Sequence, residues 1–229
     1  MPSPIEATCQ EVRFHPTDGP DADDVDAAWS FLTTPEKERA VRFHFERDRH
    51  RWIRGRAWIR QELGKALGQP AEAVAITAEP GGRLYLPDHP GFDFNLSHTG
   101  GWIALGICQE GRIGVDIETI DPTFPAMEIA AEFFLPEECD WIAQGSVERF
   151  FHLWTAKEAL MKATGRGMSL PPDKISVTIR DGQPATVTNL ETGGTCPVTT
   201  WPGPGGTIAA MLTLPIESAS SQFRQELKI

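Results

Sequence analysis

The order of hydrophobic and polar positions along the chain predicts helices separated by groups of short strands. Between residues 47 and 67 apolar side chains recur at helical spacing, and Gly68 and Pro70 follow the last of them, so we expect a long helix there. A second helix is expected at 148–164, where charged side chains interrupt an apolar helical repeat. Thr34, followed by a proline and two acidic positions, is the expected N-cap of a shorter helix.

Alternation of apolar and polar residues predicts strands in both parts of the chain. The expected strands are 10–15, 73–77, 83–86, 92–96, 102–107, 113–118, 175–179, 185–190 and 207–214. Successive side chains of a strand point to opposite faces, so the strand at 113–118 places Asp116 and Glu118 on one face and its apolar residues on the other. Two carboxylates are therefore expected to share one small space.

Several landmarks recur after about 100 residues. The pairs are Pro35 and Pro136, Gly82 and Gly182, and Gly100–Ala104 and Gly205–Ala209. This recurrence predicts an α+β fold of two similar halves related by a pseudo-twofold axis, with a ligand site in the crevice between them. The expected division is 1–110, 111–216 and a polar tail at 217–229.

Composition narrows the class of protein. The 229 residues carry a formal net charge of −11, which disfavours a nucleic-acid partner. Neither a membrane-spanning apolar run nor a signal peptide is expected, which favours the cytoplasm. The four cysteines lie far apart in the sequence, so we expect neither a zinc site nor a disulfide framework.

One stretch departs from the acidic average. Between Lys37 and Lys65 lie ten of the chain's 21 basic residues, which predicts a cationic patch suited to a small polyanion. The alternative is a solvated helix face that interspersed glutamates and aspartates partly neutralise.

Three carboxylates suggest metal chemistry. Glu158 on the second long helix joins Asp116 and Glu118 as a possible set of hard oxygen ligands for Mg²⁺, and such a site implies a substrate that contains phosphate. Lys162 lies four positions after Glu158 and faces the same way. Taken alone, that pair also fits an ordinary surface ion pair.

The segment from Asn95 to Gly101 offers hydroxyls, an imidazole and glycines to an anion. Ser97 and His98 are neighbours on a strand and point to opposite faces, and the sequence has no Gly-x-Ser-x-Gly elbow, so a serine hydrolase is disfavoured. The Pro80–Arg83 segment is an ordinary turn unless Arg83 points into the crevice.

Together these residues resemble a known family. Gly114–Glu118 followed by Trp154–Lys162 closely resembles the signature pair of the 4′-phosphopantetheinyl transferases. The segments Phe94–His98 and Gly165–Pro171 resemble the larger, surfactin-synthetase-activating type of that family.

The resemblance implies two similar halves that bind coenzyme A between them and transfer its phosphopantetheine arm to a serine of an apo acyl or peptidyl carrier protein, releasing 3′,5′-ADP. It implies that Asp116, Glu118 and Glu158 are ligands of Mg²⁺, with Mn²⁺ as an alternative metal, and that Glu158 or a metal-ordered water is the base. Lys157 and Lys162 would contact the pyrophosphate. His98 would contact the 3′-phosphate together with Arg39 and Arg42, and Ser97 and Arg83 would line the same site. Asp116, Glu158 and Lys162 are thus the expected catalytic residues.

Two other functions remain open at this point. One is a Mg²⁺-dependent hydrolase of a nucleotide pyrophosphate, which would need the same acids and lysines but use water as acceptor. The other is a module that binds carrier proteins without catalysis, which the presence of all three acids disfavours. Because both halves lie in one chain, a monomer suffices for each reading.

Overall fold

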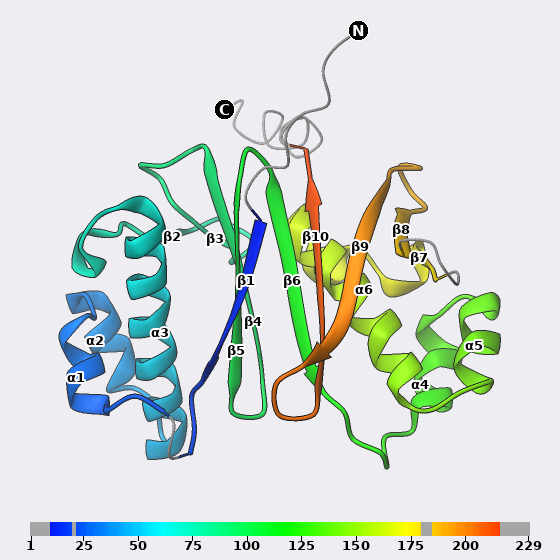
Figure 1. Cartoon of the computed structure of the whole chain (residues 1–229), viewed down its shortest axis with the longest axis horizontal. Coiled ribbons are helices and arrows are strands. Elements are labelled where there is room, and N and C mark those ends of the chain that lie inside the picture. The colour runs from blue at the N-terminus through cyan, green and yellow to red at the C-terminus, as the bar shows by residue number, and fades with distance from the viewer. Residues whose placement is uncertain (1–9, 20–21, 180–184, 216–229) are drawn as a thin grey trace, which may run out of the picture.

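The described part of the chain folds into two α+β halves that lie side by side (Figure 1). The computed structural model describes residues 10–19, 22–179 and 185–215. The N-terminal half contains β1 (Gln10–Pro16), α1 (Val25–Ser30), α2 (Thr34–Ala40), α3 (Glu46–Leu67), the 3₁₀ helix η1 (Ala71–Ala73), β2 (Thr77–Ala78), β3 (Leu84–Tyr85), β4 (Phe92–Thr99) and β5 (Trp102–Gln109). The C-terminal half contains β6 (Arg112–Thr119), α4 (Ala126–Phe133), α5 (Pro136–Ala143), α6 (Glu148–Thr164), the 3₁₀ helices η2 (Gly167–Ser169) and η3 (Pro172–Lys174), β7 (Ile175–Thr178), β8 (Ala185–Asn189), β9 (Thr195–Gly203) and β10 (Thr207–Leu214).

Both halves use the same order of elements: a strand, two short helices, a long helix, two strands and a final hairpin. The sheets repeat this order too, because β5 lies between β1 and β4 while β10 lies between β6 and β9. β8 and β7 extend the second sheet, whereas β2 and β3 form a separate two-stranded sheet. The predicted fold of two similar α+β halves is therefore confirmed, and the repeated order is the one expected of halves related by a pseudo-twofold axis.

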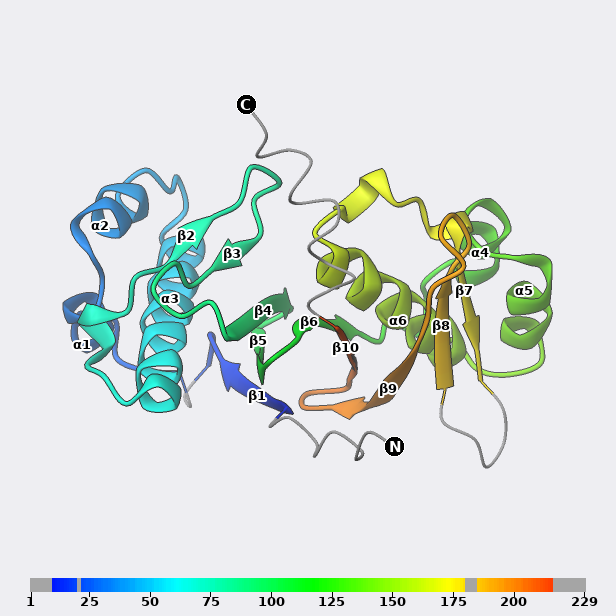
Figure 2. The same ribbon diagram turned by 90° about the horizontal axis from the view of Figure 1, so that it is seen from above.

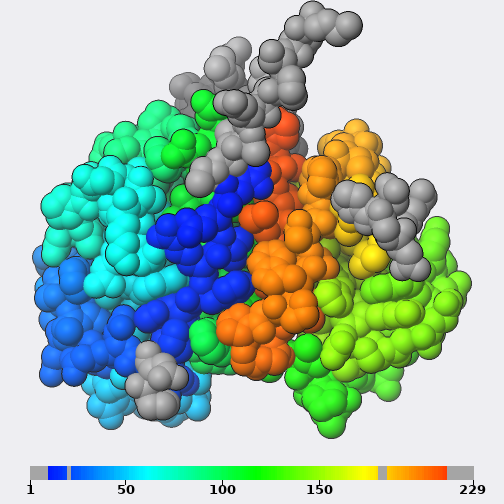
Figure 3. All heavy atoms as spheres, viewed as in Figure 1, coloured from blue at the N-terminus to red at the C-terminus, as the bar shows by residue number. Residues whose placement is uncertain are grey.

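Strands of both halves meet at the centre of the molecule and helices cover its outer ends, as Figures 1 and 2 show. One core lies between α3 and the β4–β5 hairpin, and a second surrounds α6. On the face seen in Figure 3, β1 lies beside β9 and β10, where the ring centroids of Phe14 and Trp201 are 6.4 Å apart. No helix in the described ranges combines the length and apolar character that crossing a membrane requires.

A row of side chains from β4 joins the two halves. Among the strands that the structure describes, β6 pairs through its backbone only with β10, so its other edge needs hydrogen-bond acceptors. Asp93 accepts from the backbone N–H of Ile113 at 2.7 Å, and Asn95 accepts from that of Val115 at 3.0 Å. These side chains fix the position of β4 against the strand that carries Asp116.

Two local expectations need correction. Thr33, one position before the predicted Thr34, caps α2, because Glu36 accepts from the Thr33 backbone N–H and completes a capping box. The predicted strand at 73–77 is instead η1 followed by the start of the short strand β2. Ala73 belongs to η1, and a helical residue cannot also be part of an extended strand.

Several elements had no counterpart in the sequence prediction, among them α1, α4 and β9. Helix α1 starts inside an Asp-rich segment at residues 17–26, where Asp24 accepts from the N–H groups of Asp26 and Ala27 as an N-cap. The short α4 was missed as well, and so was β9, whose Pro197 and Pro202 argue against a strand when read locally. Gly182 and the predicted tail at 217–229 lie outside the described residues.

Candidate functional site

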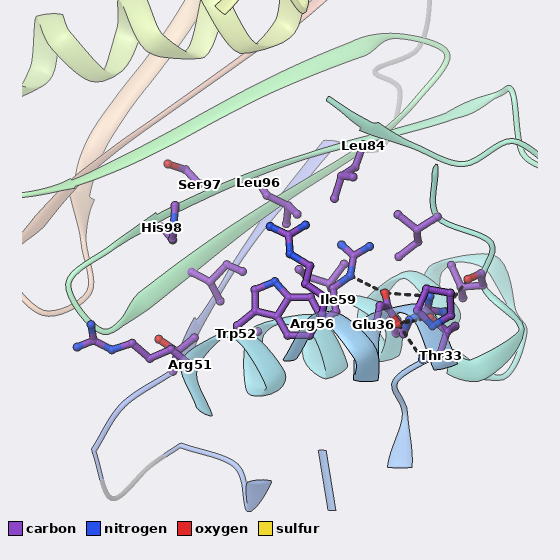
Figure 4. Close-up of a pocket in the computed structure, with 18 of the residues that line it drawn as sticks. Thr33, Glu36, Arg51, Trp52, Arg56, Ile59, Leu84, Leu96, Ser97 and His98 are labelled. Atoms are coloured by element: carbon purple, nitrogen blue, oxygen red, sulfur yellow. Dashed lines mark hydrogen bonds and ion pairs between the residues drawn. The ribbon is translucent and has the colours of Figure 1, made fainter. Parts of the chain in front are cut away.

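A cavity of about 1210 Å³ lies within the N-terminal half, and all of its lining residues fall between positions 17 and 103 (Figure 4). Its floor is one face of α3, where Arg51, Trp52, Arg56 and Ile59 follow one another at helical spacing. This volume exceeds the size of an ordinary small-molecule pocket, roughly 300–1,000 Å³, so a ligand as large as a nucleotide conjugate fits. A smaller cavity of about 340 Å³ lies at the junction of the two halves and includes Lys162.

Part of the positive charge in the large cavity is neutralised from within. Glu36 accepts from Arg56 Nε at 2.6 Å and from Arg60 Nε at 2.8 Å. Burial alone would raise the pKa of Glu36, but hydrogen bonds from Arg60 and the Thr33 backbone and the charge of Arg56 outweigh burial and lower it to about 2. The ionised Glu36 therefore anchors α2 to α3 and shapes the cavity.

Two of the three residues predicted at the 3′-phosphate line this cavity. Arg39 lies with its guanidinium carbon 5.6 Å from the centroid of the Trp52 ring, and exposed His98 faces the cavity from β4. Arg42 is exposed but is not among the lining residues, because it follows the last turn of α2. The contact of Arg42 with the 3′-phosphate therefore stays a prediction.

Ser97 connects the cavity to the acidic residues of the other half. In Figure 4 it projects from β4 on the side opposite His98, as the strand geometry predicts. The Ser97 hydroxyl donates to Asp116 Oδ1 at 2.7 Å. Lys162 Nζ donates to the same oxygen at 2.6 Å and to Ser97 Oγ at 2.8 Å. The three polar groups thus form a closed triangle at the edge of the cavity.

A glycine brings the helix of this triangle onto its strand. A Cβ atom at Gly114 would lie 1.9 Å from the backbone oxygen of Ala159, so only glycine permits α6 to pack this closely on β6. The close packing places Glu158 and Lys162, one turn apart on the half-exposed face of α6, over the carboxylates of β6.

The acids of this cluster perturb one another. Burial, followed by the charge of Asp116, raises the pKa of Glu118 to about 7, although Thr99 and Lys162 act in the opposite direction. Burial and the charge of Asp116 also raise the pKa of Glu158. One ammonium group thus faces three carboxylates, and the excess negative charge favours binding of a further cation.

One oxygen of the cluster supports a metal ligand role. Asp116 Oδ2 is buried and accepts no hydrogen bond within the described part of the chain, which is unusual for a buried carboxylate. Carboxylate oxygens are the donors that Mg²⁺ prefers, so the chemistry of the three acids fits a hard divalent cation. Across residues 10–19, 22–179 and 185–215, no three acidic, histidine or cysteine side chains converge tightly enough to form a ready-made metal site.

Lys157 points away from Glu158, about 100° around the axis of α6. Its ammonium is fully buried and donates to Glu138 at 2.6 Å, to the Ile175 oxygen at 2.7 Å and to the Pro172 oxygen at 2.9 Å. Three acceptors use all three donors of an ammonium group. The prediction that Lys157 binds the pyrophosphate is therefore wrong, because adjacent helix positions point about 100° apart and this one points into the core.

Arg83 is also a structural residue in this fold. It is buried, and its guanidinium donates to Asp93 at 2.5 Å, to the Lys162 oxygen at 2.5 Å and to the Ile113 oxygen at 2.8 Å. These bonds join the β2–β3 turn, β4, β6 and the end of α6. Arg83 lines the small cavity, whereas Ser97 lines the large one, so the prediction that both line the same site is wrong. The hydrogen bonds of Arg83 hold the halves together instead.

Sequence reasoning did not single out Arg51, Trp52 and Arg56 as site residues. They belong to the basic stretch between Lys37 and Lys65, but composition does not show which side of α3 faces a cavity. The spacing of four positions between Trp52 and Arg56 on an expected helix was the available signal.

Comparison with known proteins decides the family. A family model described as the 4′-phosphopantetheinyl transferase superfamily matches residues 112–212, and one described as the N-terminal part of these enzymes matches residues 19–110. A 4′-phosphopantetheinyl transferase of Bacillus subtilis is 32% identical over 70% of this chain and 72% of its own length. The relative HetI of Nostoc is 33% identical over 81% of this chain and 82% of its own length. The chain belongs to the 4′-phosphopantetheinyl transferases.

Phosphopantetheinyl transferases move a phosphopantetheine group from coenzyme A onto carrier proteins and are generally metal-dependent. This chain is thus a transferase, and that function is favoured over both the hydrolase and the inactive binding module. The matches extend across the acidic cluster and the large cavity, so the site lies in the part of the chain shared with the family.

Proposed function

We propose that this phosphopantetheinyl transferase binds the nucleotide part of coenzyme A in the large cavity and modifies a serine of an apo acyl or peptidyl carrier protein. The observation that carries this proposal is Ser97, which lines the cavity and also donates to Asp116 in the acidic cluster. A ligand in the cavity would therefore have its pyrophosphate next to the acids and Lys162.

The 3′-phosphate is assigned to the end of the cavity where His98 and Arg39 lie. Within the described residues, no carboxylate pairs with Arg39, so its guanidinium is open to a phosphate. An arginine binds phosphate through two parallel hydrogen bonds, which suits a terminal phosphate group.

Asp116, Glu118 and Glu158 would hold Mg²⁺, with Mn²⁺ as the alternative. When bound, this cation would offset negative charge on the pyrophosphate. The fit rests on the unpartnered Asp116 Oδ2 and on the raised pKa values of Glu118 and Glu158.

The chain's own residues then perform positioning and proton transfer. The carrier serine oxygen attacks the phosphorus that bears the pantetheine arm, its bond to that phosphorus forms, and the bond to 3′,5′-ADP breaks. Glu158, one turn before Lys162 on α6, takes the serine proton. Lys162, held by Asp116 and Ser97, donates to the phosphate oxygens that gain charge.

The same proposal covers the oligomeric state, the division into domains and the partners. Every residue placed in the site comes from one chain, so we propose that a monomer is active and that residues 1–110 and 111–216 are its two domains. The carrier protein and coenzyme A are its proposed partners, without nucleic acid or membrane.

Intact-mass measurement tests the function. Apo acyl and peptidyl carrier proteins are incubated with the chain, coenzyme A and MgCl₂, and a gain of one phosphopantetheine on a single serine is expected. Release of the same fragment into solution without a modified carrier would support the hydrolase instead. Parallel reactions with MnCl₂ or a chelator test the metal.

A further inference from the structure

Arg51 at the end of the large cavity is already bound to a carboxylate of this chain. Its Nε donates to Asp18 Oδ2 at 2.6 Å, and its Nη2 donates to the same oxygen. Asp18 lies in the segment between β1 and α1, 33 positions away in the sequence. One of the two edges through which a guanidinium can donate side by side to a phosphate, the Nε–Nη2 edge, is therefore engaged.

The backbone directly before Asp18 is fastened to the same end of the cavity. The N–H of Thr17 donates to the Gly101 oxygen at 2.7 Å, and Arg54 donates to the Thr17 oxygen at 3.2 Å. A Cβ atom at Gly101 would lie 3.0 Å from the Asp18 Cβ, so the glycine leaves room for this close contact. These contacts hold Asp18 beside the turn that follows His98.

The charges around the cavity show what this contact does. Arg39, Arg51, Arg56 and Arg60 line the cavity. Glu36 pairs with two of these arginines and Asp18 pairs with a third. Arg39 alone among the four has no carboxylate partner in the described ranges. The cavity therefore presents much less net positive charge than its arginines suggest.

We propose that Asp18 is a specificity-determining residue: it competes with the 3′-phosphate of coenzyme A for Arg51 and so limits how strongly the cavity prefers the 3′-phosphorylated nucleotide. The inference rests on the proposed placement of coenzyme A. A phosphate that reaches Arg51 must share the guanidinium with the Asp18 carboxylate, whose Oδ2 lies 2.6 Å from Arg51 Nε, and the repulsion between the two anions weakens phosphate binding.

Isothermal calorimetry with coenzyme A and 3′-dephospho-coenzyme A tests the inference on the full chain. The D18N variant should bind coenzyme A about fivefold more tightly, since half-exposed charge pairs have modest energies, while its affinity for the dephospho form should not change. D48N is the matched control: it removes one carboxylate that lines the cavity but leaves the Arg51–Asp18 pair in place. We expect less than half of the gain from it.

A double variant distinguishes competition for Arg51 from a general effect of the removed charge on nucleotide binding. In an Arg51→Gln background, Asp18→Asn should no longer improve coenzyme A binding, because the guanidinium for which the two anions compete is gone. D18S is a second neutral replacement in case D18N folds poorly. Equal gains for both nucleotides, a gain that persists without Arg51, or weaker binding by both neutral variants would overturn the inference. A wild-type chain that binds neither nucleotide would instead overturn the proposed function.

Discussion

The ammonium nitrogen of Lys162 lies 2.6 Å from Asp116 Oδ1, although the two residues are 46 positions apart. Asp116 is almost completely buried in β6, whereas the Lys162 side chain is 25% exposed and reaches it from α6. The contact brings the two family signatures together in one site. It also links the acids to Ser97 and so to the cavity of the other half.

Asp116 should be needed for transfer and not for folding. Asp116→Asn keeps the shape of the side chain but removes the charge that Lys162 and the proposed metal require, so the rate of carrier modification should fall at least about a hundredfold. Ser97→Ala removes one hydrogen bond to Asp116 and one from Lys162 but leaves the Lys162–Asp116 pair, and should have a smaller effect. The measurement is the initial rate of intact-mass gain, and a wild-type rate for Asp116→Asn would remove this residue from the proposed mechanism.

Lys157 should matter for stability and not for coenzyme A binding. Lys157→Met leaves Glu138 as a buried charge without its partner, which should lower the free energy of unfolding by about 3–5 kcal/mol in urea denaturation. Lys174→Met breaks an exposed ion pair with Asp173 and should lower it by less than about 1 kcal/mol. A Lys157→Met protein of normal stability that no longer binds coenzyme A would restore the role that sequence alone assigned to it.

Arg83 should be replaceable by lysine only with a loss of stability. An ammonium group cannot reproduce the planar fork that contacts Asp93 and the backbone oxygens of Lys162 and Ile113. Leaving one of these buried acceptors unpaired should lower the free energy of unfolding by at least about 2 kcal/mol.

The matched control for Arg83→Lys is Arg166→Lys. Arg166 pairs with Glu191 at the surface, so its replacement should change the free energy of unfolding by no more than about 0.5 kcal/mol. Equal stability of the two variants in urea would mean that Arg83 does not hold the halves together.

Stability should depend on pH through Glu36. The pKa of this carboxyl is about 2 in the folded chain and near its ordinary value of 4.5 when unfolded, so the unfolded state binds the proton first as the pH falls. The stabilisation is present above pH 4.5 and is lost progressively as the pH falls through the folded-state value near 2. Melting temperatures recorded across this window should fall less steeply for Glu36→Gln than for the wild type. Parallel slopes would exclude Glu36 as the source.

Local patterns predicted much of the fold because they reflect local physics. Apolar spacing gave α3 and α6, alternation gave β4, β5 and β6, and recurring prolines and glycines indicated two halves. The N-cap was misplaced by one position because Thr33 and Thr34 are chemically equal, and only the capping box with Glu36 distinguishes them. Strand β9 was missed because its pairing with β8 and β10 outweighs the prolines that argue against it locally.

The sequence alone determined which residue types could carry the chemistry: three acids, Lys162, the Ser97–His98 pair and a run of arginines. Only the tertiary structure decided their directions. Neighbouring helix positions diverge by about 100°, so Glu158 faces the acids while Lys157 enters the core. Gly114 lets α6 pack against β6, Glu138 forms an ion pair with Lys157, and Asp18 forms an ion pair with Arg51. Each of these depends on a partner distant in sequence, and local periodicity carries no information about such partners.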